Sequence, residues 1–258
     1  MVLVNKRLLV LLSGRGSNFL ALAEWIERHP WPIEISCVAS NRPEAGGLAL
    51  ARARGIRAVC WDTQSGGMAD FEQALERELD AAPVDLIVLA GFMRILSRDF
   101  CLRHSGRILN IHPSLLPSLT GLNTHARAIE GGVRVHGATV HRVSPELDAG
   151  PILAQGIVPV LATDSPDALA ARVLEVEHLL YPQAIAAVAA GLMQATPDGW
   201  REGPPAPGFE TLEFHPLVLH PLLHPLLHPP LHPPLSPPLA DPGAGERPLV
   251  TRPPGVQK

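Results

Sequence analysis

Short apolar runs alternate with longer amphipathic segments over the first half of the chain. Arg7–Leu12 is a continuous apolar run that ends at a glycine-rich turn, and Ile33–Ser40 and Val84–Ala90 repeat the pattern. Runs of this length, bounded by turn residues, predict strands that are buried on both faces. Two further strands are predicted at Arg57–Trp61 and Arg107–Ile111.

The segments between these runs carry apolar residues every three or four positions, which predicts helices with one buried face. Strands that alternate with helices at this spacing indicate βαβ units and a mostly parallel sheet. The predicted helices are Phe19–Arg28, Glu44–Gly55, Ala69–Ala82, a short helix capped by Ser97, Thr124–Gly131, and a long helix from Ser165 to Gly191.

The pattern changes after Pro117. Gly137–Val143 and Pro151–Val160 read as strands, and the turn-rich loop between them predicts an antiparallel hairpin with a functional tip. The predicted fold class is therefore α/β: a Rossmann-like, mostly parallel twisted sheet with helices on both faces and an antiparallel C-terminal hairpin.

Proline dominates the chain from about residue 203. Residues 203–258 hold 16 of the 28 prolines and repeat a Leu-Leu-His-Pro element. Proline at this density removes backbone donors and predicts extended or disordered chain. We expect a catalytic domain at 1–202 and a Pro/His-rich, low-complexity tail at 203–258. The five histidines from His215 to His232 are interpreted as incidental to the tail rather than as metal ligands.

Composition narrows the class of protein. The net charge is −4 and the pI is about 6.3, which gives no electrostatic reason to expect a nucleic-acid partner. The three cysteines are far apart and form no zinc or redox motif, as expected for a reducing cytosol. No secretory pattern or run of about 20 apolar residues is present in the sequence. A soluble, cytoplasmic protein without membrane or metal partners is predicted.

The first candidate for chemistry is the loop Ser13–Asn18. A strand, a glycine-rich turn and a helix can cradle a phosphate, because backbone N–H groups approach an anion at the positive end of the helix. Residue 19 is phenylalanine, so the dinucleotide fingerprint fails, and the loop has no lysine, so the triphosphate motif fails. A phosphate site of another kind stays open.

The second candidate is Ile108–Pro117, where Asn110 and His112 stand two residues apart on a predicted strand. Side chains at i and i+2 share one face of a strand, so both polar groups point the same way. The alternative is that both are hydrogen-bonded core residues. In parallel sheets ligands bind beyond the carboxyl ends of the strands. The loops Gly14–Asn18, Gly91–Leu96 and Asn110–Pro117 should meet there.

Four motifs together resemble a known family. They are SGRGSN at Ser13–Asn18, LAGFMRIL at Leu89–Leu96, LNIHPSLLP at Leu109–Pro117 and ELDAGPI at Glu146–Ile152. In order and spacing they resemble the glycinamide ribonucleotide formyltransferase family, the folate-dependent enzymes of purine synthesis, over residues 7 to about 195. The resemblance implies the formyltransferase fold.

The resemblance also implies a reaction. The formyl group of 10-formyltetrahydrofolate, a co-substrate, would pass to the amine of N1-(5-phospho-D-ribosyl)glycinamide in de novo purine (IMP) biosynthesis, releasing tetrahydrofolate. By resemblance, the catalytic residues would be Asn110, His112 and Asp148. The ribonucleotide would be bound by Gly16, Ser17 and Asn18 at its phosphate and by Glu177 at its ribose hydroxyls. The folate would be bound, largely through backbone groups, by Met93, Arg94, Ile95, Leu96, Asn110 and the loop Ser144–Asp148.

These residue types suit the chemistry. A tetrahedral oxyanion develops when a neutral amine attacks a formyl carbon, and the Asn110 amide can donate to it. His112, if protonated, can stabilise the same charge and transfer a proton to the leaving folate amine. Asp148 would favour the imidazolium and can accept the proton that the amine loses. The family has a basic residue near position 68, where this chain has Met68, so one folate contact is expected to differ.

Other interpretations stay open at this stage. Another 10-formyltetrahydrofolate user, the hydrolase or the methionyl-tRNA formyltransferase, would share Asn110 and His112 but is expected to carry an additional domain. A non-catalytic protein whose proline-rich tail docks into aromatic grooves is the alternative from a different class. His125 is balanced between a substrate contact and a structural role, whereas His141 is interpreted as structural. The oligomeric state is left between monomer and homodimer.

Overall fold

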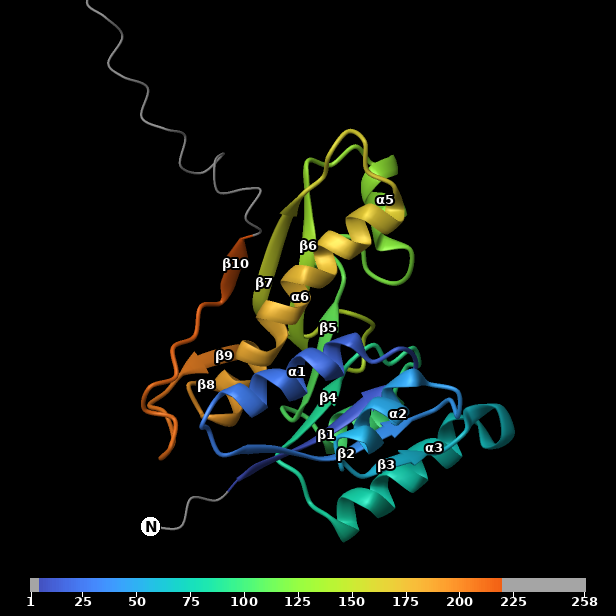
Figure 1. Cartoon of the computed structure of the whole chain (residues 1–258), viewed down its shortest axis with the longest axis vertical. Helices are drawn as coiled ribbons and strands as arrows, with labels where there is room; N and C mark the ends of the chain where they lie inside the picture. Colours follow the sequence, from blue (N-terminus) through green and yellow to red (C-terminus); the bar gives the residue numbers. More distant parts are fainter. Residues whose placement is uncertain (1–4, 220–258) are drawn as a thin grey trace, which may run out of the picture.

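In the computed structural model, which describes residues 5–219, eight strands form one sheet in the order β10-β7-β6-β5-β4-β1-β2-β3 (Figure 1). Strands β1 to β5 run parallel to one another, whereas β6 is antiparallel to both of its neighbours, β5 and β7. The strands of this sheet are β1 (Lys6–Leu12), β2 (Ile33–Ser40), β3 (Ala58–Cys60), β4 (Leu86–Leu89), β5 (Ile108–His112), β6 (Val135–Arg142), β7 (Ile152–Pro159) and β10 (Leu217–Leu219).

Six helices within the described residues connect and cover these strands. Ser97 and Ser165 cap α4 and α6, because each hydroxyl accepts the N–H of the residue three positions later. The helices are α1 (Ser17–Arg28), α2 (Gly46–Ala53), α3 (Thr63–Ala81), α4 (Arg98–Arg103), α5 (Thr124–Glu130) and α6 (Pro166–Ala189). The predicted α/β class, its mostly parallel sheet and the antiparallel β6–β7 hairpin are thus confirmed.

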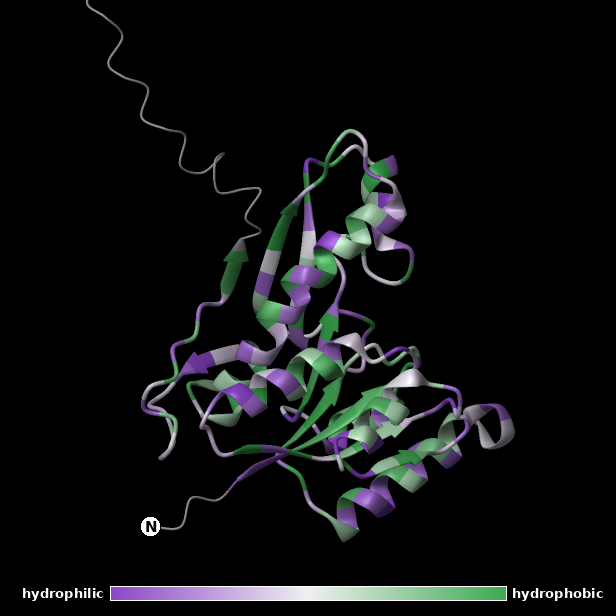
Figure 2. Cartoon of the chain, in the orientation of Figure 1, coloured by the Kyte–Doolittle hydropathy of each residue, from purple (hydrophilic) through white to green (hydrophobic). Residues whose placement is uncertain are grey.

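The apolar run of β1 supplies both faces of the sheet. Leu8, Val10 and Leu12 face one hydrophobic cluster with α1, α2 and α6, whereas Leu9 and Leu11 face a second cluster with α3 and α4. All five side chains are fully buried. Apolar residues accordingly concentrate in the central strands (Figure 2). This two-sided burial is why β1 reads as a continuous apolar run rather than as an alternating one.

Three strands were not predicted. β8 (Met193–Thr196) and β9 (Gly199–Glu202) form a separate two-stranded antiparallel hairpin, and β10 adds to the sheet parallel to β7. Phe209 and Leu212, which precede β10, are 1% and 7% exposed and belong to the first hydrophobic cluster. Residues 203–219 therefore pack on the domain rather than leaving it at residue 202. The rest of the predicted tail lies outside the described residues.

This packing predicts different results for two truncations. Removing residues 203–258 should lower the free energy of unfolding by roughly 3–6 kcal/mol, since burying one large apolar side chain stabilises by about 1.5–3 kcal/mol. Removing residues 220–258 should leave both stability and turnover unchanged. Urea denaturation of the two truncated proteins beside the full chain would measure this, and equal stability of the two would contradict it.

Candidate active site

The carboxyl ends of β1 and β4 are joined through Ser13. Its N–H donates to the Gly91 carbonyl at 3.0 Å, and its hydroxyl accepts the Met93 N–H at 2.8 Å and donates to Asn41 at 2.5 Å. At the next strand, Asn110 on β5 stands beside Leu89 on β4. The three loops that the sequence placed at one sheet edge therefore meet there, as predicted.

Asn110 is oriented by a neighbour on β6. Its Nδ2 lies 3.1 Å from His141 Nε2, and His141 Nδ1 lies 3.1 Å from the Arg142 carbonyl. The carbonyl requires a proton on Nδ1, so Nε2 accepts one N–H from Asn110 and leaves the second N–H available. Burial lowers the pKa of His141 and so favours this neutral form. His141 was expected to be structural, and this contact means that it also orients the Asn110 amide.

His112 and Asp148 lie together although they come from different elements. His112 Nδ1 is 3.5 Å from Asp148 Oδ2, an ion-pair distance, and its Nε2 is 3.1 Å from the Leu119 carbonyl. Each of the two side chains is 8% exposed. Both ring nitrogens of His112 thus face acceptor oxygens, an arrangement that the doubly protonated imidazolium complements.

The loop that carries Asp148 fixes the carboxylate through its backbone. Asp148 has φ +51°, in the left-handed region that few residues other than glycine, asparagine and aspartate adopt. Its Oδ2 also accepts the Gly121 N–H at 2.8 Å. The carboxylate is therefore held between His112 and the loop that follows β5, and it faces the interior of the site.

The phosphate-loop candidates stand at the start of α1. Gly16 precedes the helix with φ +82°, and a Cβ there would come within 2.7 Å of the Gly47 backbone, so this position requires glycine. Ser17 and Asn18 are the first two residues of the helix. Asn18 Nδ2 donates to Glu177 Oε2 on α6 at 2.7 Å, and the buried Asn18 Oδ1 has no hydrogen-bond partner among residues 5–219. The structure thus brings together the residues that the resemblance assigned to phosphate and to ribose.

Burial on α6 raises the pKa of Glu177 to about 7. The folded protein therefore binds this proton more tightly than the unfolded chain, whose glutamate pKa is 4.5. Stability from the neutral carboxyl is complete below the unfolded pKa and is lost as the pH rises through 7.

Glu177→Gln should remove this pH dependence while keeping an acceptor for Asn18. Relative to wild type, we expect the variant to gain roughly 2–3 kcal/mol of unfolding free energy between pH 5 and pH 8. Urea denaturation of both proteins at the two pH values measures how the difference in unfolding free energy between variant and wild type changes with pH. A difference near zero would mean that the buried carboxyl is not neutral when folded.

The folate-loop candidates differ in how they are placed. Met93 and Ile95 are 63% and 67% exposed, whereas Leu96 is buried in the second hydrophobic cluster. Arg94 between them is exposed. The loop is pinned at its far end by Glu72, which accepts both the N–H and the hydroxyl of Ser97 at 2.5 Å. A loop held at both ends can offer its backbone groups in fixed positions.

Two more histidines stand close to the site. His125 and His136 contact edge to face, with ring centroids 5.3 Å apart. Burial lowers the pKa of His136 to about 4, with a smaller contribution from the charge of His125. Burial also lowers the pKa of His125, helped by the charge of His112. Both imidazoles are thus neutral near pH 7, and His125 packs against a histidine that sequence reasoning did not single out as its partner.

Side chains on β6 and β7 hold the loop that follows His112, a role that sequence reasoning missed. Thr139 on β6 donates to the Ser114 carbonyl at 2.6 Å and accepts the Leu116 N–H at 3.0 Å. Gln155 on β7 donates to the Leu116 carbonyl at 2.9 Å. The signal for Thr139 was its spacing, since it stands two residues before His141 and therefore on the same face of β6.

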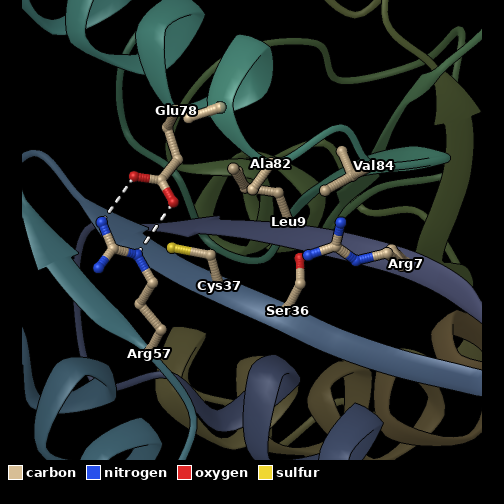
Figure 3. A pocket seen from close by; sticks show the side chains of 9 residues that line it. Arg7, Leu9, Ser36, Cys37, Arg57, Glu78, Ala82 and Val84 are labelled. Atoms are coloured by element: carbon tan, nitrogen blue, oxygen red, sulfur yellow. Dashed lines mark hydrogen bonds and ion pairs between the residues drawn. The ribbon is translucent and has the colours of Figure 1, made fainter.

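The opposite edge of the sheet holds a separate cavity of about 250 Å³ (Figure 3). Cys37 lines it beside Arg57, whose guanidinium donates to both carboxylate oxygens of Glu78 at 3.0 and 2.9 Å. Burial raises the pKa of Cys37 to about 11, so the thiol stays protonated and unreactive.

The sequence description of the formyl transferase family matches residues 6–185. The chain belongs to the formyl transferase family. The match includes the phosphate-loop candidates, Asn110, His112, Asp148 and Glu177. The family takes its formyl groups from folate-derived donors and acts on small-molecule substrates.

Two relatives show which branch of the family this chain is similar to. It is 42% identical over 202 residues to the phosphoribosylglycinamide formyltransferase of Escherichia coli (strain K12), covering 76% of this chain and 93% of that enzyme. It is 46% identical over 186 residues to the trifunctional purine biosynthetic protein adenosine-3 of Gallus gallus, covering 72% of this chain. The match spans only 18% of that larger protein.

A solved structure supports the same family. The crystal structure of phosphoribosylglycinamide formyltransferase from Anaplasma phagocytophilum superposes on this chain with a TM-score of 0.73 at 39% sequence identity. The alignment covers 83% of this chain and 97% of that one. In residues 5–219, no helix is long and apolar enough to cross a membrane, and no group of three or more metal-ligating side chains is found.

Proposed function

We propose that this chain transfers the formyl group of 10-formyltetrahydrofolate to the amine of N1-(5-phospho-D-ribosyl)glycinamide, in purine biosynthesis. The products are formylglycinamide ribonucleotide and tetrahydrofolate. The observation that carries the proposal is the meeting of Asn110, His112 and Asp148 between a phosphate-type loop and an exposed apolar loop. The names of the relatives agree with this reaction.

Asn110 acts on the oxygen of the formyl group. The amine attacks the formyl carbon, and the carbonyl oxygen becomes an oxyanion in the tetrahedral intermediate. One Asn110 N–H is held by His141, so the amide is already oriented and its second N–H can donate to that oxygen. The oriented donor needs no reorganisation when the charge develops, which is the condition for strong stabilisation.

His112 and Asp148 move the protons. The imidazolium of His112, beside the Asp148 carboxylate, stabilises the oxyanion and protonates the folate nitrogen as its bond to the formyl carbon breaks. Asp148 accepts the proton that the attacking amine loses, directly or through water. The proton that Asp148 has gained then passes to the neutral His112, which restores the imidazolium and the carboxylate for the next turnover.

The two substrates would enter from different sides of this trio. Gly16, Ser17 and Asn18 would hold the phosphate at the start of α1, and Glu177 would hold the ribose hydroxyls. Opening the Asn18–Glu177 hydrogen bond would supply both polar groups, including the unpartnered Asn18 Oδ1. The exposed apolar side chains of Met93 and Ile95 would face the folate, while the backbone of residues 93–96 binds its pterin.

The decisive experiment follows 10-formyltetrahydrofolate consumption spectroscopically with each acceptor in turn. 10-Formyltetrahydrofolate should be consumed only when the ribonucleotide is present. The amount consumed should equal the amount of formylglycinamide ribonucleotide formed. Consumption without an acceptor would instead indicate a hydrolase, and consumption with initiator methionyl-tRNA would indicate a tRNA formyltransferase. A folded protein that uses no acceptor would overturn the proposal.

A further inference from the structure

The base of the loop that carries Asp148 is closed by backbone contacts. We call residues 143–150, between β6 and β7, the Asp148 loop. The Arg142 N–H donates to the Pro151 carbonyl at 3.0 Å, which joins the residues on either side of the loop. A Cβ on Gly150 would come within 1.7 Å of the Arg142 carbonyl oxygen, so the two ends of the loop are in direct backbone contact.

The β8–β9 hairpin reaches this base from the far end of the chain. Arg142 Nη1 donates to the Thr196 carbonyl at 2.7 Å, and its Nη2 donates to the Pro197 carbonyl at 3.3 Å. Thr196 is the last residue of β8, and Pro197 is the first residue of the turn that follows. Trp200 on β9 donates its Nε1–H to the Pro151 carbonyl at 3.2 Å, so that carbonyl accepts two hydrogen bonds.

Arg142 and Trp200 also contact each other. The guanidinium carbon lies 6.0 Å from the centroid of the Trp200 ring, at the outer limit of a cation–π contact. Arg142 is 9% exposed, and no carboxylate among residues 5–219 lies within ion-pair distance of it. A buried charge is costly unless polar groups compensate it. The carbonyls of Thr196 and Pro197 compensate the charge, so this end of the β8–β9 hairpin has to stay in place.

We propose that the β8–β9 hairpin is a clamp on the base of the Asp148 loop, and that Arg142 and Trp200 are positioning residues that set the approach of Asp148 to His112. Asp148 stands three residues before Pro151, so a shift at the base is transmitted to it over a short path. The role rests on the proposed function, because it acts through the proton-accepting carboxylate.

The test combines one readout that needs no activity with one that does. Hydrogen exchange of residues 143–150 reports whether the loop has loosened, and steady-state kinetics report whether catalysis follows. The variants are Trp200→Ala, which removes both contacts, Trp200→Phe, which keeps a ring over Arg142, and Arg142→Met. Arg201→Met is the matched control, since Arg201 is exposed on the same strand and bonds only to Gln194 within the hairpin.

In Trp200→Ala and Arg142→Met, exchange in the Asp148 loop should rise about tenfold and kcat should fall about tenfold, because small misplacements of reacting groups cost up to about 10²-fold. The KM for 10-formyltetrahydrofolate should also rise, while the KM for the ribonucleotide stays unchanged. A preparation in which part of the protein is inactive would show a lower kcat but unchanged KM values for both substrates. Trp200→Phe, which keeps the ring but lacks the Nε1–H, should lie between Trp200→Ala and wild type, and Arg201→Met should match wild type.

Unchanged loop exchange and folate KM in folded Trp200→Ala and Arg142→Met proteins would overturn the clamp. If the alanine variant fails to fold, Trp200→Phe still decides, because removing the Nε1–H alone should raise loop exchange measurably. If wild type shows no turnover, the proposed function fails, whereas the exchange measurement still tests the clamp.

Discussion

His112→Ala is expected to lower kcat by about 10³-fold, within the range of about 10²–10⁴ that a positioned general acid contributes. The variant loses the imidazolium that faces Asp148 and the Leu119 carbonyl, and with it the proton for the leaving folate nitrogen. The KM for the ribonucleotide should change little, because the phosphate loop and Glu177 lie on α1 and α6. Single-turnover measurements with saturating substrates would isolate the chemical step.

A second histidine variant controls for the general effect of losing an imidazole. His104→Gln removes a ring whose Nε2 lies 3.0 Å from Glu76 Oε2. His104 directly follows α4 and lies near the amino end of β5. We expect it to retain wild-type turnover. If His112→Ala kept more than a tenth of the wild-type rate, a group other than His112 would have to donate the proton.

Asp148→Asn should lower kcat by roughly 10²-fold or more without disturbing the loop. Asparagine tolerates the left-handed backbone at φ +51° and keeps an oxygen that can accept the Gly121 N–H. The substitution therefore removes mainly the negative charge, which leaves His112 without its counter-ion and the attacking amine without a proton acceptor. Stopped-flow kinetics beside a thermal melt separate this chemical loss from any loss of folding.

Glu146→Gln is the matched control in the same loop. Glu146 is exposed, and its carboxylate pairs only loosely with Arg98 at 3.4 Å. Exposed pairs of this kind contribute about 0–1 kcal/mol, so both stability and turnover should be close to wild type. Equal losses in the two variants would show that loop charge in general, rather than the Asp148–His112 pair, governs the rate.

Local patterns in the sequence were sufficient for most of the fold. Leu8 to Leu12 are apolar at every position because β1 is buried on both faces, and this apolar run is visible in the sequence alone. Ser97 and Ser165 capped their helices as expected from residue type alone. The carboxyl-end loops were also predictable, because parallel strands must end at one edge of the sheet.

The packing of residues 203–219 was not predictable from composition. Proline-rich sequence predicted extended or disordered chain beyond residue 202, yet Phe209 and Leu212 are buried and β10 pairs with β7. Proline is tolerated beside an edge strand, where missing N–H donors cost little. A few apolar residues among the prolines decided the outcome, because the first hydrophobic cluster offered them a place to pack.

By itself, the sequence determined the helices and the seven strands β1 to β7, the shared face of Asn110 and His112, and the family whose motifs it carries. Only the tertiary structure decided which distant side chains meet. Asn18 and Glu177 are 159 residues apart in the chain, yet Asn18 Nδ2 lies 2.7 Å from Glu177 Oε2, and the end of β8 contacts Arg142. Such contacts depend on how helices pack on a twisted sheet. Local periodicity encodes which face of each element is buried, but not which neighbour that face contacts.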